Sequence, residues 1–212
     1  MTRTPLLRAA AFALCAGAPA ALVLAPAVPA VAQARDSGAE QFVQREASHA
    51  LQILHTENGP QEKAAFRAFV DQAADVPRIT DFVLGKYRRT ITPAQYQQFA
   101  AAFRAYADSV YENRLGQYHG ETLRVTGSAI RQPGDVVVNS EVVGGRHPQP
   151  VQVAWRVIKG PQGWKVVDVN VAGVWLAITE RQDFVSTLDN NGGRIEVLIN
   201  QLRNQTVTAP RS

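Results

Sequence analysis

Four short segments in the middle of the chain, each with the residue pattern of a β-strand, constrain its fold more than any other feature. In the third run, Val151, Val153, Trp155 and Val157 alternate with polar neighbours, as in a strand with one buried face. The separators between runs are short and rich in glycine and proline, which is typical of antiparallel neighbours. The sequence therefore predicts a four-stranded antiparallel meander over residues 122–131, 135–143, 150–158 and 164–171.

Helical patterns lie on both sides of this meander. Thr92-Pro93 has the residues expected at a helix start, with threonine at the cap and proline in the first turn. The helix predicted from there to about Gly116 carries apolar residues three and four positions apart, at Tyr96, Phe99, Phe103, Tyr106, Val110 and Tyr111. Further helices are predicted over residues 38–54, 61–74, 77–84, 174–188 and 194–203. Helices, then strands, then helices indicate an α+β fold with helices packed on one sheet face.

The N-terminus has the pattern of a secretory signal peptide. Arg3 and Arg8 precede an uncharged stretch from residue 9 to residue 34, which ends in Ala32-Gln33-Ala34. Three prolines interrupt this stretch and argue against a continuous membrane-spanning helix. We therefore predict a signal peptide over residues 1–34, cleaved near Ala34, and a single exported domain over residues 35–212.

The predicted mature chain has no cysteine, because Cys15 lies within the leader. Disulfides, zinc–thiolate sites and thiol nucleophiles are therefore excluded from it. Removing Arg3 and Arg8 lowers the formal net charge of the chain from +4 to +2. Lysine and arginine are not clustered as in nucleic-acid-binding proteins, and no second long apolar run follows, so we expect a soluble protein that binds no nucleic acid.

The sequence contains no recognisable catalytic, metal or cofactor motif. Its histidines lack the spacing of metal ligands, and there is neither a phosphate-binding glycine loop nor a Gly-x-Ser-x-Gly elbow. The four histidines are His49, His55, His119 and His147. We accordingly predict that the protein is not an enzyme and holds no metal or cofactor.

Two charged features have alternative readings. Asp168 stands among apolar residues, where a buried carboxylate can act as a base. Alternatively, Asp168 faces solvent or bonds to a neighbouring strand or helix end. The structural role is the favoured one. Lys86, Arg88 and Arg89 form a basic run that either meets a lipid phosphate or membrane surface, or is a solvated helix end.

Several segments together resemble the periplasmic phospholipid-binding component of the Mla system, the MlaC, Ttg2 or toluene-tolerance family of ABC-transporter auxiliary proteins. The closing segment from Val166 to Val174 is the most specific of them. The others are Leu84-Gly85-Lys86-Tyr87, residues 92–99 leading to Phe103, then Leu176, Arg181, Phe184, Gly192-Gly193 and the helix at 198–202. The resemblance covers nearly all of the mature chain.

The resemblance implies a periplasmic carrier with an NTF2-like cone, in which a curved four-stranded antiparallel sheet and the N- and C-terminal helices surround an apolar pocket. Such a monomeric carrier takes a phospholipid between an inner-membrane ABC transporter complex and an outer-membrane lipoprotein/porin complex. Acyl chains occupy the pocket, and the head group stays outside. In this chain the lipid-contacting residues are expected to be Phe82, Leu84, Tyr87, Phe99, Phe103, Tyr106, Val151, Val153, Trp155, Val169, Val171, Val174 and Trp175.

The chain departs from the family pattern at two positions. Trp175 stands where the family usually has serine, and Glu180 stands where it usually has tyrosine. A bulky Trp175 near the pocket opening suggests a narrower pocket or another cargo, such as a hopanoid-like lipid. Two further alternatives remain open: an NTF2-like isomerase or dehydratase that uses Asp168, and an interaction module for a membrane complex that binds no lipid.

Overall fold

The computed structural model describes residues 34–56, 59–115, 120–145 and 149–208. Residues from Gln33 to Ser212 form one compact unit. Nearly all of the predicted signal peptide lies outside the described residues, as do Cys15, His119 and His147.

The predicted α+β class and the antiparallel sheet are confirmed. The sheet is a meander in the order β1-β2-β3-β4-β5, in which each strand pairs with its neighbour in the sequence. Within the described residues it has five strands, one more than predicted. Their bounds are Thr122–Gln132 (β1), Asp135–Val143 (β2), Val151–Gly160 (β3), Gly163–Val171 (β4) and Val174–Trp175 (β5).

The additional strand occupies the start of the segment predicted as a helix over residues 174–188. A two-residue turn folds the chain back after β4, with positive φ angles at both Ala172 (50°) and Gly173 (92°). Positive φ at both central positions is the property of the type I′ turn that joins hairpin strands. The amide of Gly173 also donates to the Asn170 side chain at 2.9 Å. This turn chemistry determines the local structure, and the helix begins only at Leu176.

The helices follow the predicted order. They are α1 (Ser37–Thr56), α2 (Pro60–Ala73), α3 (Val76–Leu84), the 3-10 helix η1 (Gly85–Arg89), α4 (Pro93–Leu115), α5 (Leu176–Asn190) and α6 (Ile195–Thr208). The predicted cap of α4 is confirmed as a capping box: the amide of Gln95 donates to Thr92 Oγ1, and the amide of Thr92 donates to Gln95 Oε1.

One hydrophobic core, which we call the sheet core, lies between α1 and the sheet. Its buried members are Ala39, Phe42, Val43, Val136, Val138 and Val157. Helix α1 also covers the edge strand: the side-chain amide of Gln44 donates to the carbonyl of Leu123 and accepts from the amide of Val125, both at 3.2 Å. Pairing an edge strand in this way removes free backbone groups that would otherwise attract another strand.

A second core, which we call the helical core, lies among α3, α4, α5 and α6. Phe99 and Phe103 stack at 5.8 Å, and Phe184 meets both rings edge-on. Other buried members are Val83, Leu84, Ala102, Ala177, Leu188, Ile195, Leu198, Ile199 and Leu202. Edge-on and offset aromatic pairs are favourable beyond the area they bury, so these rings join α4 to α5 firmly.

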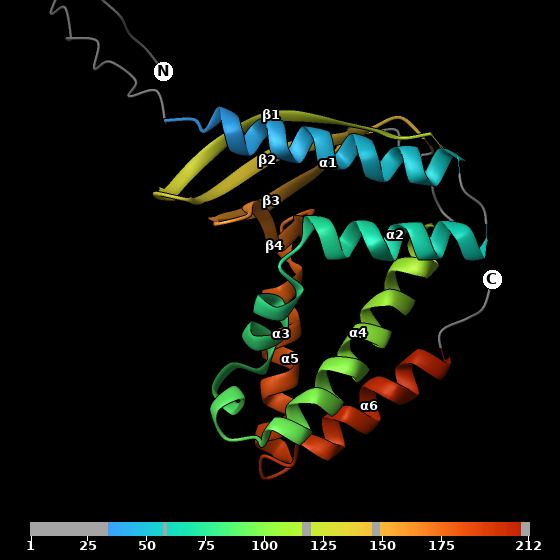
Figure 1. Cartoon of the computed structure of the whole chain (residues 1–212), viewed down its shortest axis with the longest axis vertical. Coiled ribbons are helices and arrows are strands. Elements are labelled where there is room, and N and C mark those ends of the chain that lie inside the picture. Colours follow the sequence, from blue (N-terminus) through green and yellow to red (C-terminus); the bar gives the residue numbers. More distant parts are fainter. Residues whose placement is uncertain (1–33, 57–58, 116–119, 146–148, 209–212) are drawn as a thin grey trace, which may run out of the picture. The chain divides into compact units, whose positions relative to one another are not determined.

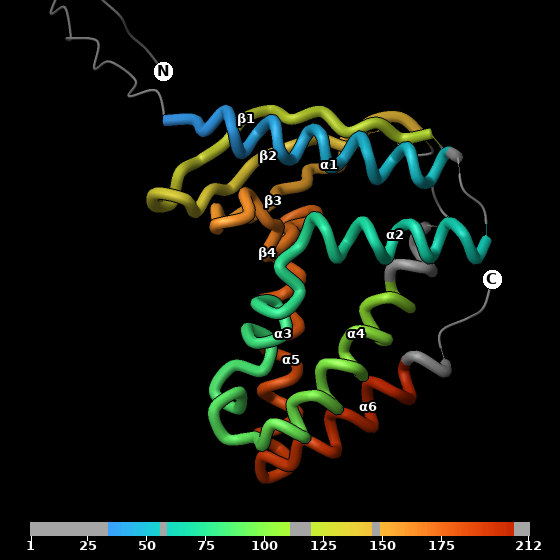
Figure 2. Tube along the Cα trace, in the orientation of Figure 1, coloured from blue at the N-terminus to red at the C-terminus, as the bar shows by residue number. Residues whose placement is uncertain are grey.

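Helix α2 connects the regions of the two cores. Figure 1 shows α1 along the sheet, and α3 with α5 and α4 with α6 extending away from it. The chain turns sharply from α2 into α3, and the C-terminal half of α4 approaches α2 (Figure 2). The turn is anchored to the sheet, because Ala74 bridges Val166 and the amide of Asp75 donates to the Val166 carbonyl at 2.9 Å.

Candidate functional site: an apolar cavity between the two cores

A cavity of about 200 Å³ lies where the sheet core meets the helical core. Its walls come from α2, α3, α4, β4 and α5, and most of the residues are aliphatic or aromatic. The lining residues are Val70, Ala74, Val76, Ile79, Val83, Phe103, Arg104, Tyr106, Ala107, Asp108, Val110, Val166, Val167, Asp168, Val169, Leu176, Ala177 and Glu180.

A β-bulge shapes the wall that β4 provides. Arg156 pairs with Asp168, but the next residue, Val157, pairs with Val166, so Val167 is an extra residue in the strand. A regular strand presents every second side chain to one side, whereas a bulge locally changes that alternation. Four consecutive residues around this bulge, from Val166 to Val169, line the cavity.

Helical spacing produces the walls from α4 and α5. Phe103, Ala107 and Val110 recur at intervals of four and three residues and therefore lie on one face of α4. Leu176 and Glu180 lie one turn apart on α5. Val110 and Leu176 are 38% and 40% exposed although they line the cavity, which identifies them as residues of its mouth.

Asp168 is used structurally. Its Oδ1 accepts hydrogen bonds from the amides of Val169 and Ala177, both at 2.8 Å, and its side chain is buried. Ala177 lies in the first turn of α5, so the carboxylate satisfies a free helix amide and meets the positive end of the helix dipole. Burial raises the pKa of Asp168, while these amide hydrogen bonds and Arg156 oppose the rise. Asp168 is therefore bonded to a helix end, as one of the structural alternatives had it, and it does not face solvent.

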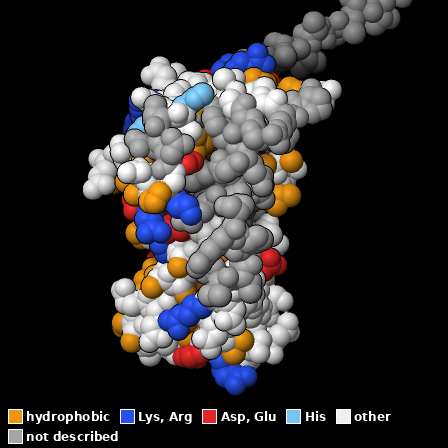
Figure 3. Space-filling model, turned by 90° about the vertical axis from the view of Figure 1, so that its right-hand side faces the viewer, with side chains coloured by type: hydrophobic (Ala, Val, Ile, Leu, Met, Phe, Trp, Pro, Cys, Tyr) orange, Lys and Arg blue, Asp and Glu red, His pale blue; other side chains and the backbone are white. Residues whose placement is uncertain are grey.

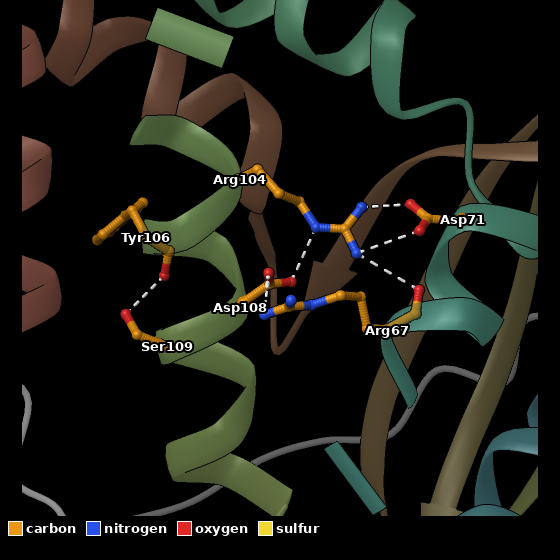
Figure 4. A network of polar contacts seen from close by, with 6 residues as sticks. All are labelled: Arg67, Asp71, Arg104, Tyr106, Asp108 and Ser109. Carbon is orange, nitrogen blue, oxygen red and sulfur yellow. Dashed lines mark hydrogen bonds and ion pairs between the residues drawn. The ribbon is translucent and has the colours of Figure 1, made fainter. Parts of the chain in front are cut away.

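A group of charged residues joins α2 to α4 beside the cavity, and we call it the α2–α4 ion-pair cluster (Figure 4). Arg104 donates to Asp71 and, at 2.9 Å, to Asp108, while Arg67 pairs with Asp108 at 2.8 Å. Burial lowers the pKa of Arg104, but the hydrogen bonds and charges of Asp71 and Asp108 outweigh burial and leave the pKa raised. Two cations therefore balance two anions.

The remaining polar pair on the wall is Tyr106 and Glu180. The Tyr106 hydroxyl donates to Glu180 Oε1 at 3.0 Å. Burial, followed by the charge of Glu180, raises the pKa of Tyr106 to about 12. Burial also raises the pKa of Glu180; the Tyr106 hydrogen bond opposes this rise and the nearby Asp183 reinforces it.

The structure brings three of the thirteen predicted lipid-contacting residues to the cavity: Phe103, Tyr106 and Val169. Leu84 and Phe99 are fully buried in the helical core, and Phe82 and Tyr87 pack against that core. Trp155 packs against the sheet core, and Val153 is buried in β3. The others are outside the lining: Val151, Val171 and Trp175 are half-buried, and Val174 is half exposed.

Sequence reasoning missed the contribution of α2 and of the start of α5. In α3 it selected Phe82 and Leu84, whereas Val76, Ile79 and Val83 line the cavity. The spacing of Phe103, Ala107 and Val110 was visible in the sequence as a helical face. In α2, the spacing of Phe66, Phe69 and Val70 marks an apolar face, but spacing alone does not show what that face packs against. The bulge at Val167 likewise depends on pairing with another strand.

The basic run lies in η1 and is largely engaged by acidic residues. Lys86 pairs with Asp189 at 2.7 Å, and Arg88 pairs with Asp81 at 2.6 Å while also lying over the Tyr96 ring. Neither residue lines the cavity. The face shown in Figure 3 carries basic, acidic and hydrophobic side chains interspersed among the described atoms.

The described part of the chain contains neither a metal-binding cluster nor a membrane-spanning helix. Within residues 34–208 and outside the gaps already named, no group of three or more histidine, cysteine, aspartate or glutamate side chains is arranged to hold a metal. Across the same described segments, every helix is too short or too polar to cross a bilayer.

Comparison with known proteins gives consistent results. Residues 44–204 match the model of the MlaC protein family. The toluene tolerance protein ttg2D of Pseudomonas putida is 29% identical over 115 residues, a match that spans 54% of this chain and about half (53%) of that relative. The phospholipid-binding protein of Ralstonia solanacearum, solved in complex with a phospholipid, superposes with a TM-score of 0.66 at 26% identity. That superposition covers 82% of this chain and 98% of the Ralstonia chain.

The family match extends from α1 through α6 and includes every element that walls the cavity. The structural match has the same α+β architecture over nearly all of the other protein's length. On these grounds, the chain belongs to the MlaC family.

Proposed function

We propose that this protein is a carrier that binds a phospholipid, with acyl-chain segments in the cavity between the two cores, and that it has no enzymatic activity. The observation that carries the proposal is an apolar-lined cavity in a fold whose Ralstonia relative is complexed with a phospholipid. Each chain methylene removed from water contributes about 0.8 kcal/mol, so such a site can hold a lipid with few polar contacts.

The proposal includes the setting inferred from the sequence. The protein works in the periplasm after cleavage near Ala34, as a monomer. It exchanges its lipid with an inner-membrane ABC transporter complex and an outer-membrane lipoprotein/porin complex. The near-neutral charge of the predicted mature chain supports docking to proteins rather than electrostatic binding to a membrane surface.

Binding a whole phospholipid requires the cavity to widen. Its volume of about 200 Å³ is below the roughly 300–1,000 Å³ of typical small-molecule pockets. Helix α2 is the wall best suited to move, because Ala73 is the one buried residue among its fourteen, all of which are described. Its C-terminal end is held to β4 at Ala74, so α2 can pivot there.

Lipid content of the purified protein tests the proposal. The full chain is expressed in a Gram-negative bacterium, recovered from the periplasm, and analysed by native mass spectrometry and by lipid extraction. We expect about one phospholipid per protein and an N-terminus near Arg35. The same protein, stripped of lipid, should reload from phospholipid vesicles. Protein that is folded but empty, and stays empty with vesicles, would contradict the proposal.

A further inference from the structure

The cavity wall carries one acidic side chain whose charge is not balanced. Five lining residues have polar ends: Arg104, Tyr106, Asp108, Asp168 and Glu180. Arg104 and Asp108 belong to the α2–α4 ion-pair cluster, where two arginines meet two aspartates. Asp168 is held by backbone amides at the start of α5.

Glu180 differs from these residues. Its hydrogen-bond partner is the hydroxyl of Tyr106, a neutral donor. Among the described residues, Glu180 forms no ion pair with a lysine, arginine or histidine, and the charge that acts on it is Asp183, of the same sign. The neighbouring Arg181 is directed elsewhere, with its guanidinium 4.9 Å from the centre of the Phe82 ring.

The Tyr106–Glu180 pair lies close to the cavity mouth. Glu180 is one helical turn after Leu176 on α5, and Tyr106 is one turn before Val110 on α4. Leu176 and Val110 are the partly exposed lining residues that mark the mouth. A lipid with its chains in the cavity therefore places its head group near the Glu180 carboxylate.

The chemistry of head groups follows from this position. A carboxylate near the mouth repels a head group that carries only negative charge, and it attracts a cation. A primary ammonium has three N–H donors and can give Glu180 a charge-assisted hydrogen bond. An anionic head group that bears hydroxyls can also donate a hydrogen bond to Glu180, but the donor is neutral. The negative charge of its phosphate is then not balanced by any positive charge on the head group.

Resting on the proposed function, we propose that Glu180 is a specificity-determining residue, which makes the carrier prefer phospholipids with a primary ammonium head group over anionic phospholipids. Because Arg67 and Arg104 together balance Asp71 and Asp108, Arg104 does not cancel this preference. Tyr106 positions the Glu180 carboxylate through its hydroxyl.

A competition between two lipids tests the inference. Periplasmic protein stripped of lipid is equilibrated with vesicles containing equal amounts of phosphatidylethanolamine and phosphatidylglycerol with identical acyl chains. Bound lipids are then counted by mass spectrometry. We expect the wild type to be enriched in phosphatidylethanolamine, and Glu180→Gln to lower the bound ratio by about threefold to tenfold. Glu180→Lys should reverse the preference. Glu196→Gln, at an exposed position of α6 outside the cavity lining, is the matched control and should leave the ratio unchanged.

The outcomes are distinguishable. If the wild type binds both lipids and the ratio is the same in Glu180→Gln and Glu180→Lys, this inference is overturned and the proposed function stands. If the wild type binds neither lipid, the proposed function fails and the inference fails with it. A circular dichroism spectrum identifies any variant that does not fold, and in that case Tyr106→Phe, which frees the carboxylate from its positioning hydrogen bond, should also change the ratio.

Discussion

Asp168 connects the sheet to α5 through a single carboxylate. Its Oδ1 accepts from the amides of Val169 in β4 and Ala177 in α5. Because a buried amide without a partner is costly, the carboxylate stabilises the start of α5 against the strand that walls the cavity. The residue that looked most like a general base therefore orders one side of the candidate lipid site.

Removing this carboxylate should destabilise the fold. We expect Asp168→Ala to lower the free energy of unfolding by about 1–3 kcal/mol, because two backbone amides lose their acceptor. Urea denaturation followed by circular dichroism measures the change. Asp183→Ala, at an exposed position of the same helix, should change stability by less than about 0.5 kcal/mol. Equal effects of the two substitutions would argue against the capping role.

Glu180 should leave a signature in the pH dependence of stability. Burial, as the main cause, raises the pKa of Glu180 in the folded protein above its value in the unfolded chain. The folded state therefore binds the proton more tightly, and this stabilisation is present below the unfolded pKa of about 4.3. It is lost as the pH rises through the folded pKa.

Glu180→Gln removes that titration. Between about pH 4 and about pH 7, we expect the variant to gain stability relative to the wild type, as measured by the difference between their urea midpoints. The wild type and variant are compared at each pH, so that contributions from the other carboxylates cancel. A difference that stays constant, or shrinks with rising pH, would show that Glu180 is not destabilised by burial.

At the scale of elements, the β4–β5 turn places α5. Ala172 has a φ of 50°, a conformation that costs an ordinary L-residue about 1–2 kcal/mol relative to glycine. Ala172→Gly should therefore raise the melting temperature, with part of the gain offset by the added freedom of the unfolded chain.

The next residue provides the opposite change. Gly173 has a φ of 92°, and a Cβ added there meets no atom within 4 Å, so Gly173→Ala tests backbone conformation alone. We expect it to lower the free energy of unfolding by about 1 kcal/mol. Calorimetry on both variants checks the pair. If the two substitutions shift the melting temperature in the same direction, the turn does not have the type I′ conformation described.

The α2–α4 ion-pair cluster should control how easily α2 separates from the cavity. Asp108 contacts both Arg67 and Arg104, so Asp108→Asn weakens both ion pairs. We expect the free energy of local opening to fall by about 1 kcal/mol, which corresponds to a roughly fivefold rise in amide exchange in α2.

Hydrogen exchange read by mass spectrometry measures this opening segment by segment. Asp81→Asn, which breaks the Arg88 ion pair at η1, is a matched control and should leave exchange in α2 unchanged. Exchange that rises equally in α2 and α6 would indicate global destabilisation instead. The difference in α2 exchange between the wild type and Asp108→Asn should also become smaller at high salt, since these charges are partly exposed.

At the scale of the whole molecule, the cavity itself can be filled. Ala107 lines it from α4, whereas Ala105 is exposed on another side of the same helix. We expect Ala107→Phe to reduce bound phospholipid to less than about a tenth of the wild-type amount, because the ring occupies space that acyl chains need. Ala105→Phe should bind lipid normally. Lipid retention by a folded Ala107→Phe protein would place the lipid elsewhere.

A charged substitution tests whether a strand residue faces the lipid, and two positions with the same prediction differ in the structure. Both Val153 and Val169 are predicted to face the lipid, but Val169 lines the cavity and Val153 does not. Val169→Lys should abolish lipid retention because an unpaired ammonium is costly in an apolar site. A circular dichroism spectrum of the variant shows whether it is folded, and its lipid content shows whether it binds. Together the two measurements separate loss of binding from loss of folding.

Local patterns predicted much of this molecule. The alternation in Val151, Val153, Trp155 and Val157 placed β3 correctly, and Thr92-Pro93 marked the start of α4. Both signals are local: alternation follows from the two-residue period of a strand, and a cap follows from the free amides of one helix end. For the same reason, the order of helices and strands in this α+β fold could be predicted from the sequence alone.

The position of the cavity was decided by tertiary structure. Phe99 and Phe103 lie on the same stripe of α4, yet Phe99 is sealed in the helical core while Phe103 reaches the cavity. The bulge at Val167 depends on its pairing with β3, and the walls from α2 and α5 depend on how those helices pack. The period of a helix or strand determines on which side of that element a given residue lies. Only the packing of one element against another determines whether that side meets a core or an open space.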